Sequence, residues 1–138
     1  PNVDTKLLRI KCVFFATTLY SMPVSFVPAV ADHIMKTVKR CMEENDNDPK
    51  VLDLIKEGSY GTDESFKKFI YCSYYKSGYA NQDGSVLPDK VIKAFPESAN
   101  IGDVTKKCSE IRAKSPVETT YEFFKCFESN APIRVGLN

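Results

Sequence analysis

Apolar residues recur every three or four positions between Thr62 and Gly78, which is the spacing of one face of a helix. Thr62 is a favourable N-cap residue, two acidic residues follow it, and Gly78 can adopt the left-handed conformation that ends a helix. The apolar face consists of Phe66, Phe69, Ile70 and Tyr74. The pattern therefore predicts a central helix, and this helix carries Cys72 near its middle.

Two further helices are predicted before this segment. The first runs from residue 25 or 26 to about residue 44, because apolar side chains repeat on one face and Pro28 is tolerated in a first turn. Asp48 and Pro49 have the residue types of an N-cap and a first helical position, and they begin a short helix that stops at Gly58. Cys41 lies on the apolar face of the longer helix.

Three helices are predicted after the central one. Residues 87–95 form a short helix, and residues 101–114 form another with apolar side chains on one side. The last helix has the strongest start signal, because Ser115 as N-cap and Glu118 at the third position form a capping box. Its apolar positions are Val117, Tyr121, Phe123, Phe124 and Phe127. No alternation long enough for a strand occurs, so the chain is predicted to be all-α with about six helices.

Length and charge exclude several classes of protein. The 138 residues suit one domain with a modest core, which we place at residues 25–138. The net charge is +1, and no basic block is interleaved with aromatic residues, so we expect no nucleic-acid partner.

Residues 1–24 form a separate segment with the character of a secretion signal. Basic residues precede an apolar run from Cys12 to Val30, and residues 29–31 have the small-x-small form of a signal-peptidase site. Pro23 interrupts the run after about eleven residues, against the roughly twenty that a membrane-spanning helix needs, so no membrane span is predicted. The segment is either a signal or an N-terminal arm of the mature protein.

The two alternatives differ in what they imply for assembly. If the segment is a signal, its cleavage removes Cys12, and four of the five cysteines remain, which is an even number. As an arm, it exposes apolar side chains that must be sheltered by the pocket of the domain or by a second copy, which favours a homodimer. Cys12 is then a free thiol or part of an intermolecular bridge.

The remaining four cysteines lie inside predicted helices. Cys41 and Cys72 are separated by 30 residues, Cys72 and Cys108 by 35, and Cys108 and Cys126 by 17. In this spacing the chain resembles the insect odorant-binding proteins, a family that includes the pheromone-binding proteins and has six cysteines in a six-helix fold. The family's second and fifth cysteines, which bond to each other, would fall at positions occupied here by lysine and valine.

This paired replacement leaves no orphan thiol, so the chain looks like the four-cysteine "minus-C" type. Lys68 and Val117 occupy the two positions. The resemblance implies disulfides between Cys41 and Cys72 and between Cys108 and Cys126, and helices arranged around an internal apolar cavity. It also implies a carrier of odorants, pheromones or similar lipophiles, secreted into sensillar lymph or another body fluid, with an odorant receptor as a candidate partner.

Aromatic residues of the central and last helices are the predicted wall of the cavity, and plain core packing is the alternative for each of them. The predicted ligand-binding residues are Phe66, Phe69, Ile70, Tyr74, Tyr121, Phe123, Phe124 and Phe127. Two of them, Tyr74 and Tyr121, could offer a hydroxyl group to a polar part of the ligand. Because the missing third bridge would have tied the central helix to the last one, we expect an adaptable cavity.

Enzymatic functions have little support. His33 is the single histidine, which excludes two-histidine acid-base schemes and histidine-rich metal sites, so we predict no enzyme, no metal site and no cofactor. His33 is either a structural residue or a pH sensor in ligand release. Two other functions stay open: a secreted helical interaction or signalling protein that acts through its surface, and a salivary or haemolymph carrier of amines or lipids.

Overall fold

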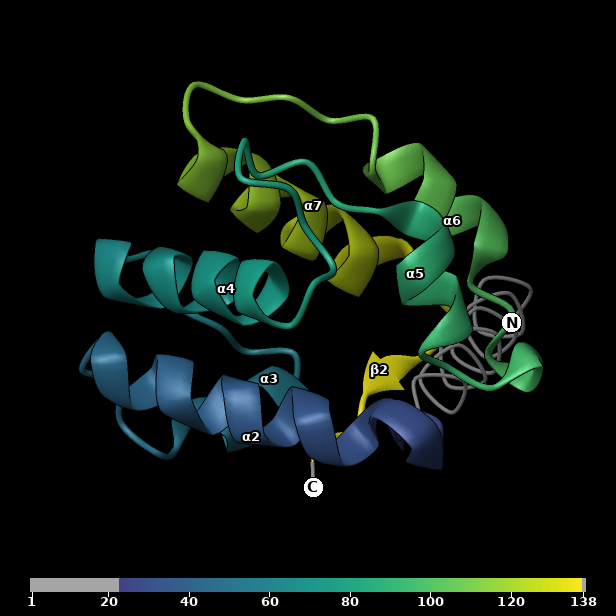
Figure 1. The fold of residues 1–138 in the computed structure, drawn as a ribbon, viewed down its shortest axis with the longest axis horizontal. Coiled ribbons are helices and arrows are strands. Elements are labelled where there is room, and N and C mark those ends of the chain that lie inside the picture. Colours follow the sequence, from purple (N-terminus) through teal and green to yellow (C-terminus); the bar gives the residue numbers. More distant parts are fainter. Residues whose placement is uncertain (1–22, 138) are drawn as a thin grey trace, which may run out of the picture.

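The computed structural model describes residues 23–137, and this part of the chain folds into six α-helices (Figure 1). The α-helices are α2 (Pro28–Glu44), α3 (Val51–Lys56), α4 (Glu64–Lys76), α5 (Pro88–Lys93), α6 (Gly102–Cys108) and α7 (Pro116–Asn130). A 3-10 helix, η1 (Glu97–Ala99), follows α5. The prediction of an all-α fold with six helices is confirmed. None of the helices within residues 23–137 has both the length and the apolar character required to cross a membrane.

The ends of the central and last helices follow the expected capping chemistry. Asp63, one residue after the predicted N-cap, accepts a hydrogen bond from the backbone N–H of Phe66 at 3.3 Å. Gly78 has a φ of +89°, as expected for the residue that ends α4. The hydroxyl of Ser115 accepts from the backbone N–H of Glu118 at 3.1 Å, which confirms the N-cap of α7.

Several helix boundaries differ from the prediction. The first helix begins at Pro28 rather than at residue 25 or 26, and α3 begins after Lys50, whose N–H donates to the Asp48 carboxylate at 2.8 Å. The prediction of a helix over residues 101–114 is wrong beyond residue 108. There the guanidinium of Arg112 donates to the carbonyl oxygens of Ser109 and Ile111, each at 2.8 Å, and so satisfies acceptors at the end of α6.

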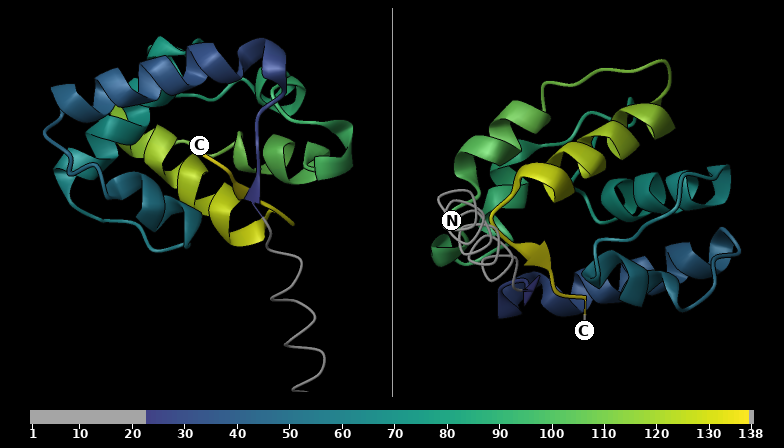
Figure 2. Two further views of the ribbon diagram at one scale, coloured as in Figure 1. Left: turned by 90° about the horizontal axis from the view of Figure 1, so that it is seen from below. Right: turned by 180° about the vertical axis from the view of Figure 1, so that it is seen from behind.

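A two-stranded parallel sheet joins the two ends of the described chain, and the sequence did not predict it. Strand β1 (Pro23–Val24) pairs with β2 (Arg134–Val135), and the N–H of Gly136 donates to the carbonyl oxygen of Val24 at 2.9 Å. The strands have two residues each, too few to produce an alternating pattern. The sheet brings the segment after α7 back across the molecule toward α2 (Figure 2).

Two disulfides connect the helices, with the pairing that the family resemblance implied. Cys41 of α2 is bonded to Cys72 of α4, and Cys108 of α6 is bonded to Cys126 of α7, each pair with Cα atoms 5.7 Å apart. Each bridge restricts the unfolded chain and is expected to stabilise the fold by about 3 kcal/mol. Cys12, for which two states were predicted, lies outside the described residues, as does the predicted N-terminal arm.

An ion pair joins α4 to α7 next to the positions where the third disulfide of the family would lie. Lys67 donates to the Glu118 carboxylate at 2.9 Å, and its ammonium group lies 5.1 Å from the ring centroid of Tyr121. Lys68 and Val117 are the adjacent residues in the two helices. The contact between α4 and α7 is therefore electrostatic and aromatic at this point, where a six-cysteine relative has a covalent bond.

Helix α4 packs between α2 and α7, while α6 packs on α7 and α5 on α6 (Figure 1). The apolar faces of these helices meet in one continuous core, which also takes up side chains of the segment after α7. Ile133 and Leu137 of that segment are both 8% exposed. The core is thus closed by the C-terminal segment as well as by helices.

Candidate functional site

The core surrounds a cavity of about 90 Å³ between α2, α4, α5, α7 and the C-terminal segment. Its wall consists of Phe26, Ile34, Val38, Ile55, Phe69, Ile70, Ser73, Tyr74, Ser77, Tyr79, Val91, Ala94, Phe95, Phe124, Phe127, Glu128, Val135 and Leu137. Most of these side chains are apolar, which is the typical lining of a small-molecule site. The cavity is therefore the candidate functional site.

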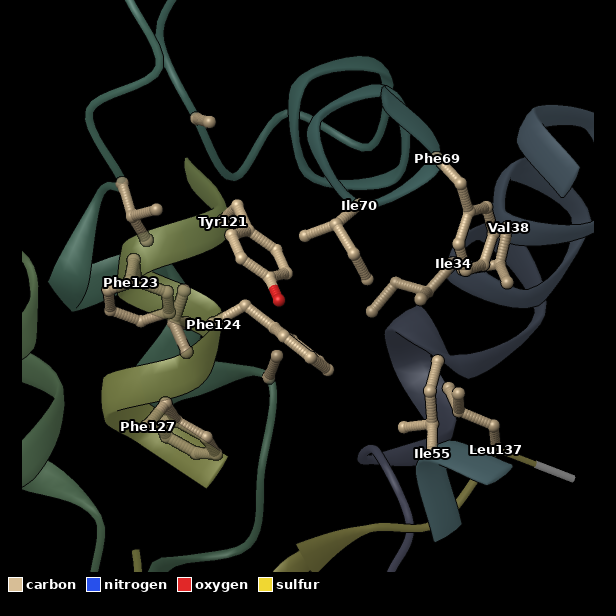
Figure 3. Close-up of a cluster of buried hydrophobic side chains, with 14 of the residues drawn as sticks. Ile34, Val38, Ile55, Phe69, Ile70, Tyr121, Phe123, Phe124, Phe127 and Leu137 are labelled. Atoms are coloured by element: carbon tan, nitrogen blue, oxygen red, sulfur yellow. The ribbon is translucent and has the colours of Figure 1, made fainter. Parts of the chain in front are cut away.

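Helical spacing explains how α2, α4 and α7 supply most of the wall. Ile34 and Val38 are four residues apart on α2, and Ile70 and Ser73 of α4 and its C-cap Ser77 are spaced by three and four. On α7 the wall residues are Phe124, Phe127 and Glu128, again at spacings of three and four. Figure 3 shows side chains from these helices converging, with Ile34 of α2 and Ile70 of α4 directed toward Phe124 of α7.

Five of the eight residues predicted to bind ligand lie on the wall. They are Phe69, Ile70, Tyr74, Phe124 and Phe127. They come from α4 and α7, the two helices on which the prediction rested. The cavity therefore lies between the predicted helices, and ligand contact by these five side chains stays a prediction.

The other three, Phe66, Tyr121 and Phe123, are buried in the core but do not border the cavity. The ring of Phe66 packs against Tyr121, with centroids 6.2 Å apart, and the Tyr121 hydroxyl donates to the carbonyl oxygen of Gly61 at 3.0 Å. Phe123 packs behind the wall, because its ring centroid lies 5.7 Å from that of Tyr74. These three side chains support the wall instead of forming its surface.

Two parts of the wall were not among the predicted ligand-binding residues: the C-terminal segment and the region of α5. Val135 lines the cavity from β2, and Leu137 lines it from two residues further along the chain. On another side, the rings of Phe26 and Phe95 lie 5.0 Å apart, and the N–H of Val27 donates to the carbonyl oxygen of Ala94 at 2.8 Å. In the C-terminal segment the available signal was the alternation of the apolar residues Ile133, Val135 and Leu137. Three positions are too few to predict a strand or a place on the cavity wall.

Polar groups interrupt the apolar wall. Among the lining residues that the structure describes, Glu128 of α7 is the one with a carboxyl group. Its Oε1 atom is buried and has no hydrogen-bond partner in the described part of the chain. Burial raises the pKa of the Glu128 carboxyl to about 7, and the positive charge of Arg134 on β2 partly opposes this effect. The wall therefore contains a carboxyl group that changes its charge near neutral pH.

Three hydroxyl groups, from Ser73 and Tyr74 of α4 and from its C-cap Ser77, add to the polar part of the wall. Burial raises the pKa of the Tyr74 phenol, and the nearby charge of Glu128 raises it further. The Ser77 hydroxyl donates to the carbonyl oxygen of Ser73 at 2.5 Å, while the Ser73 hydroxyl is buried without a partner among the described residues. Tyr74 and Ser73 thus offer hydroxyl groups to the cavity close to a titrating carboxyl group.

Two other candidate groups do not lie at the cavity. Cys41, Glu44 and Cys72 place ligand-type atoms within 4.8 Å of one another, but the two sulfur atoms are bonded to each other and are not available as thiolates. His33 is exposed on α2 and does not belong to the wall. Glu128 is therefore the titratable carboxyl group on the wall itself, and His33 lies away from it.

Sequence and structure comparisons place these features among known proteins. Residues 24–130 match the model of the PBP/GOBP family. General odorant-binding protein 69a of Drosophila melanogaster is 23% identical over 107 residues, which are 75% of this chain and 72% of that protein.

Two solved structures share the fold. Odorant-binding protein 7 of Anopheles gambiae, described with four disulfide bridges and an azo compound, superposes with a TM-score of 0.60 at 24% identity, over 71% of this chain and 82% of that chain. A medfly odorant-binding protein superposes with a TM-score of 0.55 at 17% identity, over 72% of this chain and 89% of that chain. Since the family model covers most of the described residues, the chain belongs to the PBP/GOBP family of odorant-binding proteins.

Proposed function

We propose that the protein is a secreted carrier that takes up small hydrophobic ligands, such as odorants, pheromones or similar lipophiles, in the cavity between α2, α4 and α7. The observation that carries this proposal is a largely apolar cavity between helices that two disulfides hold together. Binding by burial needs no reactive group, and each methylene group that leaves water contributes about 0.8 kcal/mol.

The size of the cavity indicates that the wall moves when a ligand enters. About 90 Å³ is less than the roughly 150 Å³ of an engineered apolar cavity that holds benzene. A larger ligand therefore displaces some side chains. The segment that carries Val135 and Leu137 is a candidate for this movement, because it is held by a sheet of two residue pairs and not by a long helix.

Disulfides support the extracellular part of the proposal, because such bridges persist in oxidising compartments. An odorant receptor as partner and a homodimer formed through residues 1–24 remain predictions. The alternative, a protein that acts through its surface, is favoured by the stacked rings of Tyr71 and Tyr75, 5.5 Å apart, of which Tyr75 is 40% exposed. Phe123, which could also have belonged to such a patch, is buried.

A binding titration separates the two functions. The protein is titrated with the neutral fluorescent probe N-phenyl-1-naphthylamine, and the bound probe is then displaced with a homologous series of alkanols. A carrier binds one probe per cavity saturably and binds longer alkanols progressively more tightly, up to the limit of the cavity. Non-saturable probe fluorescence, or no binding, would favour the surface-acting alternative.

A further inference from the structure

The carboxyl group of Glu128 has no structural role that accounts for its place on the cavity wall. Other glutamates form ion pairs near the surface: Glu122 on the same helix with Lys125 at 2.9 Å, and Glu44 on α2 with Lys76 at 2.7 Å. Glu128, in contrast, belongs to a wall that is mainly apolar, and its buried Oε1 atom accepts no hydrogen bond from any described residue. A buried acceptor without a donor is unfavourable, so its presence requires an explanation.

The neighbouring cation does not supply the missing donor. Arg134 on β2 is close enough to act on the charge of Glu128, but its Nη1 atom donates to the carbonyl oxygen of Lys56 at 3.1 Å. No ion pair within residues 23–137 includes Glu128. The carboxylate therefore keeps its hydrogen-bonding capacity for a group that enters the cavity.

The chemistry of this part of the wall selects the kind of group that fits. A carboxylate accepts hydrogen bonds and attracts a positive charge, and an ammonium group offers three donors in a small volume. The hydroxyl groups of Ser73 and Tyr74 on α4 lie on the same wall and can accept the remaining N–H groups. The other wall residues suit a hydrocarbon chain or ring.

We propose that Glu128 determines ligand selection, and that this carrier prefers apolar molecules that end in a basic amine, whose ammonium group binds the Glu128 carboxylate inside the cavity. This inference rests on the proposed function, because it requires that ligands occupy the cavity. It adds a charged anchor to binding by burial, so that one class of lipophile is bound more tightly than neutral molecules of the same length.

The same geometry makes amine binding dependent on pH. An ammonium ion pairs with the ionised carboxyl group, and burial places the pKa of Glu128 at about 7 in the empty cavity. Arg134 on β2 and Tyr74 on α4 are the other charged or titratable groups that act on Glu128 or respond to it, and burial raises the pKa of the Tyr74 phenol further above neutral pH. Amine affinity should therefore fall on the order of tenfold per pH unit below pH 7.

The test compares three ligands of equal chain length, n-octylamine, 1-octanol and octanoate, as competitors of N-phenyl-1-naphthylamine. Wild type is compared with Glu128→Gln, which keeps the shape of the side chain and removes its charge. Glu122→Gln on the same helix is the control, because Glu122 pairs with Lys125 at the surface and lies outside the cavity. Circular dichroism confirms that each variant is folded.

The expected order of affinity for wild type at pH 7.5 is octylamine, then octanol, then octanoate. Glu128→Gln should weaken octylamine at least tenfold, leave octanol within about twofold, and remove the pH dependence of octylamine binding, while Glu122→Gln changes none of these values. If octylamine binds no more tightly than octanol, or if Glu128→Gln leaves its affinity and pH profile unchanged, the inference is refuted while the carrier function stands. If neither the probe nor any of the three ligands binds to wild type, both the carrier function and the inference fail.

Discussion

The buried carboxyl group of Glu128 makes a quantitative prediction about the stability of the ligand-free protein. In the unfolded chain a glutamate titrates near 4.5, whereas burial places the pKa of Glu128 at about 7 in the folded chain. Below pH 4.5 the group is protonated in both states and has no effect on the pH dependence of stability. Between pH 4.5 and pH 7 the unfolded state ionises first, so the free energy of unfolding falls as pH rises, and above pH 7 the full loss is present.

The difference between these two pKa values corresponds to about 3 kcal/mol, which is a large part of the stability of a domain of this size. Glu128→Gln removes the ionisation. The free energy of unfolding of wild type should therefore fall by about 3 kcal/mol relative to the variant between pH 4.5 and pH 8, or on the order of 10 °C in melting temperature. The two proteins are compared by how steeply the free energy of unfolding changes with pH. Their absolute stabilities are not compared, because the buried amide of Glu128→Gln has a desolvation cost of its own that does not change with pH.

The measurement is thermal unfolding followed by circular dichroism, in half-unit steps from pH 4.5 to pH 8 and with the disulfides intact. It gives the change of stability with pH for wild type and for Glu128→Gln. Glu122→Gln serves again as the control, since its carboxylate is partly exposed and paired with Lys125. Parallel curves for wild type and Glu128→Gln would refute the reasoning, because they would show that the carboxyl group ionises as easily in the folded protein as in the unfolded chain.

Two further predictions concern the links between helices. Replacing Cys108 and Cys126 together by serine should lower the free energy of unfolding by about 3 kcal/mol, measured by denaturant titration, and an unchanged midpoint would contradict the role of this bridge. Introducing cysteines at Lys68 and Val117 should restore a covalent link between α4 and α7 and narrow the range of alkanol lengths that displace the probe. An unchanged range in the oxidised variant would show that the absent bridge does not make the cavity adaptable.

The helices and their caps could be predicted because they depend on local sequence. Ser115 begins α7 through a hydrogen bond to a backbone N–H three residues away, and Gly78 ends α4 through a conformation that glycine adopts easily. The end of α6 was missed because Arg112 satisfies carbonyl oxygens there from outside the helix, which no periodic pattern reveals.

The cavity could be predicted only in part, for a physical reason. A helical stripe shows which side chains are buried, but whether a buried side chain meets another side chain or a void depends on the packing of all the helices. Phe69 and Phe66 lie on the same stripe of α4, yet Phe69 borders the cavity while Phe66 packs against Tyr121. The part of the wall formed by Leu137 depends on a two-residue sheet and could not be expected from the sequence.

The most direct test of the central claim is to reduce the volume of the cavity without changing the surface. Ala94 is 3% exposed and lines the cavity from the end of α5, so Ala94→Leu directs a larger side chain into a space of about 90 Å³. Ala113, which is exposed and outside the cavity, provides the matched control Ala113→Leu. Ala94→Leu should lower the affinity for N-phenyl-1-naphthylamine at least tenfold, while Ala113→Leu should leave it unchanged. Equal affinities for wild type and both folded variants would show that ligands bind elsewhere and would contradict the assignment of this cavity as the binding site.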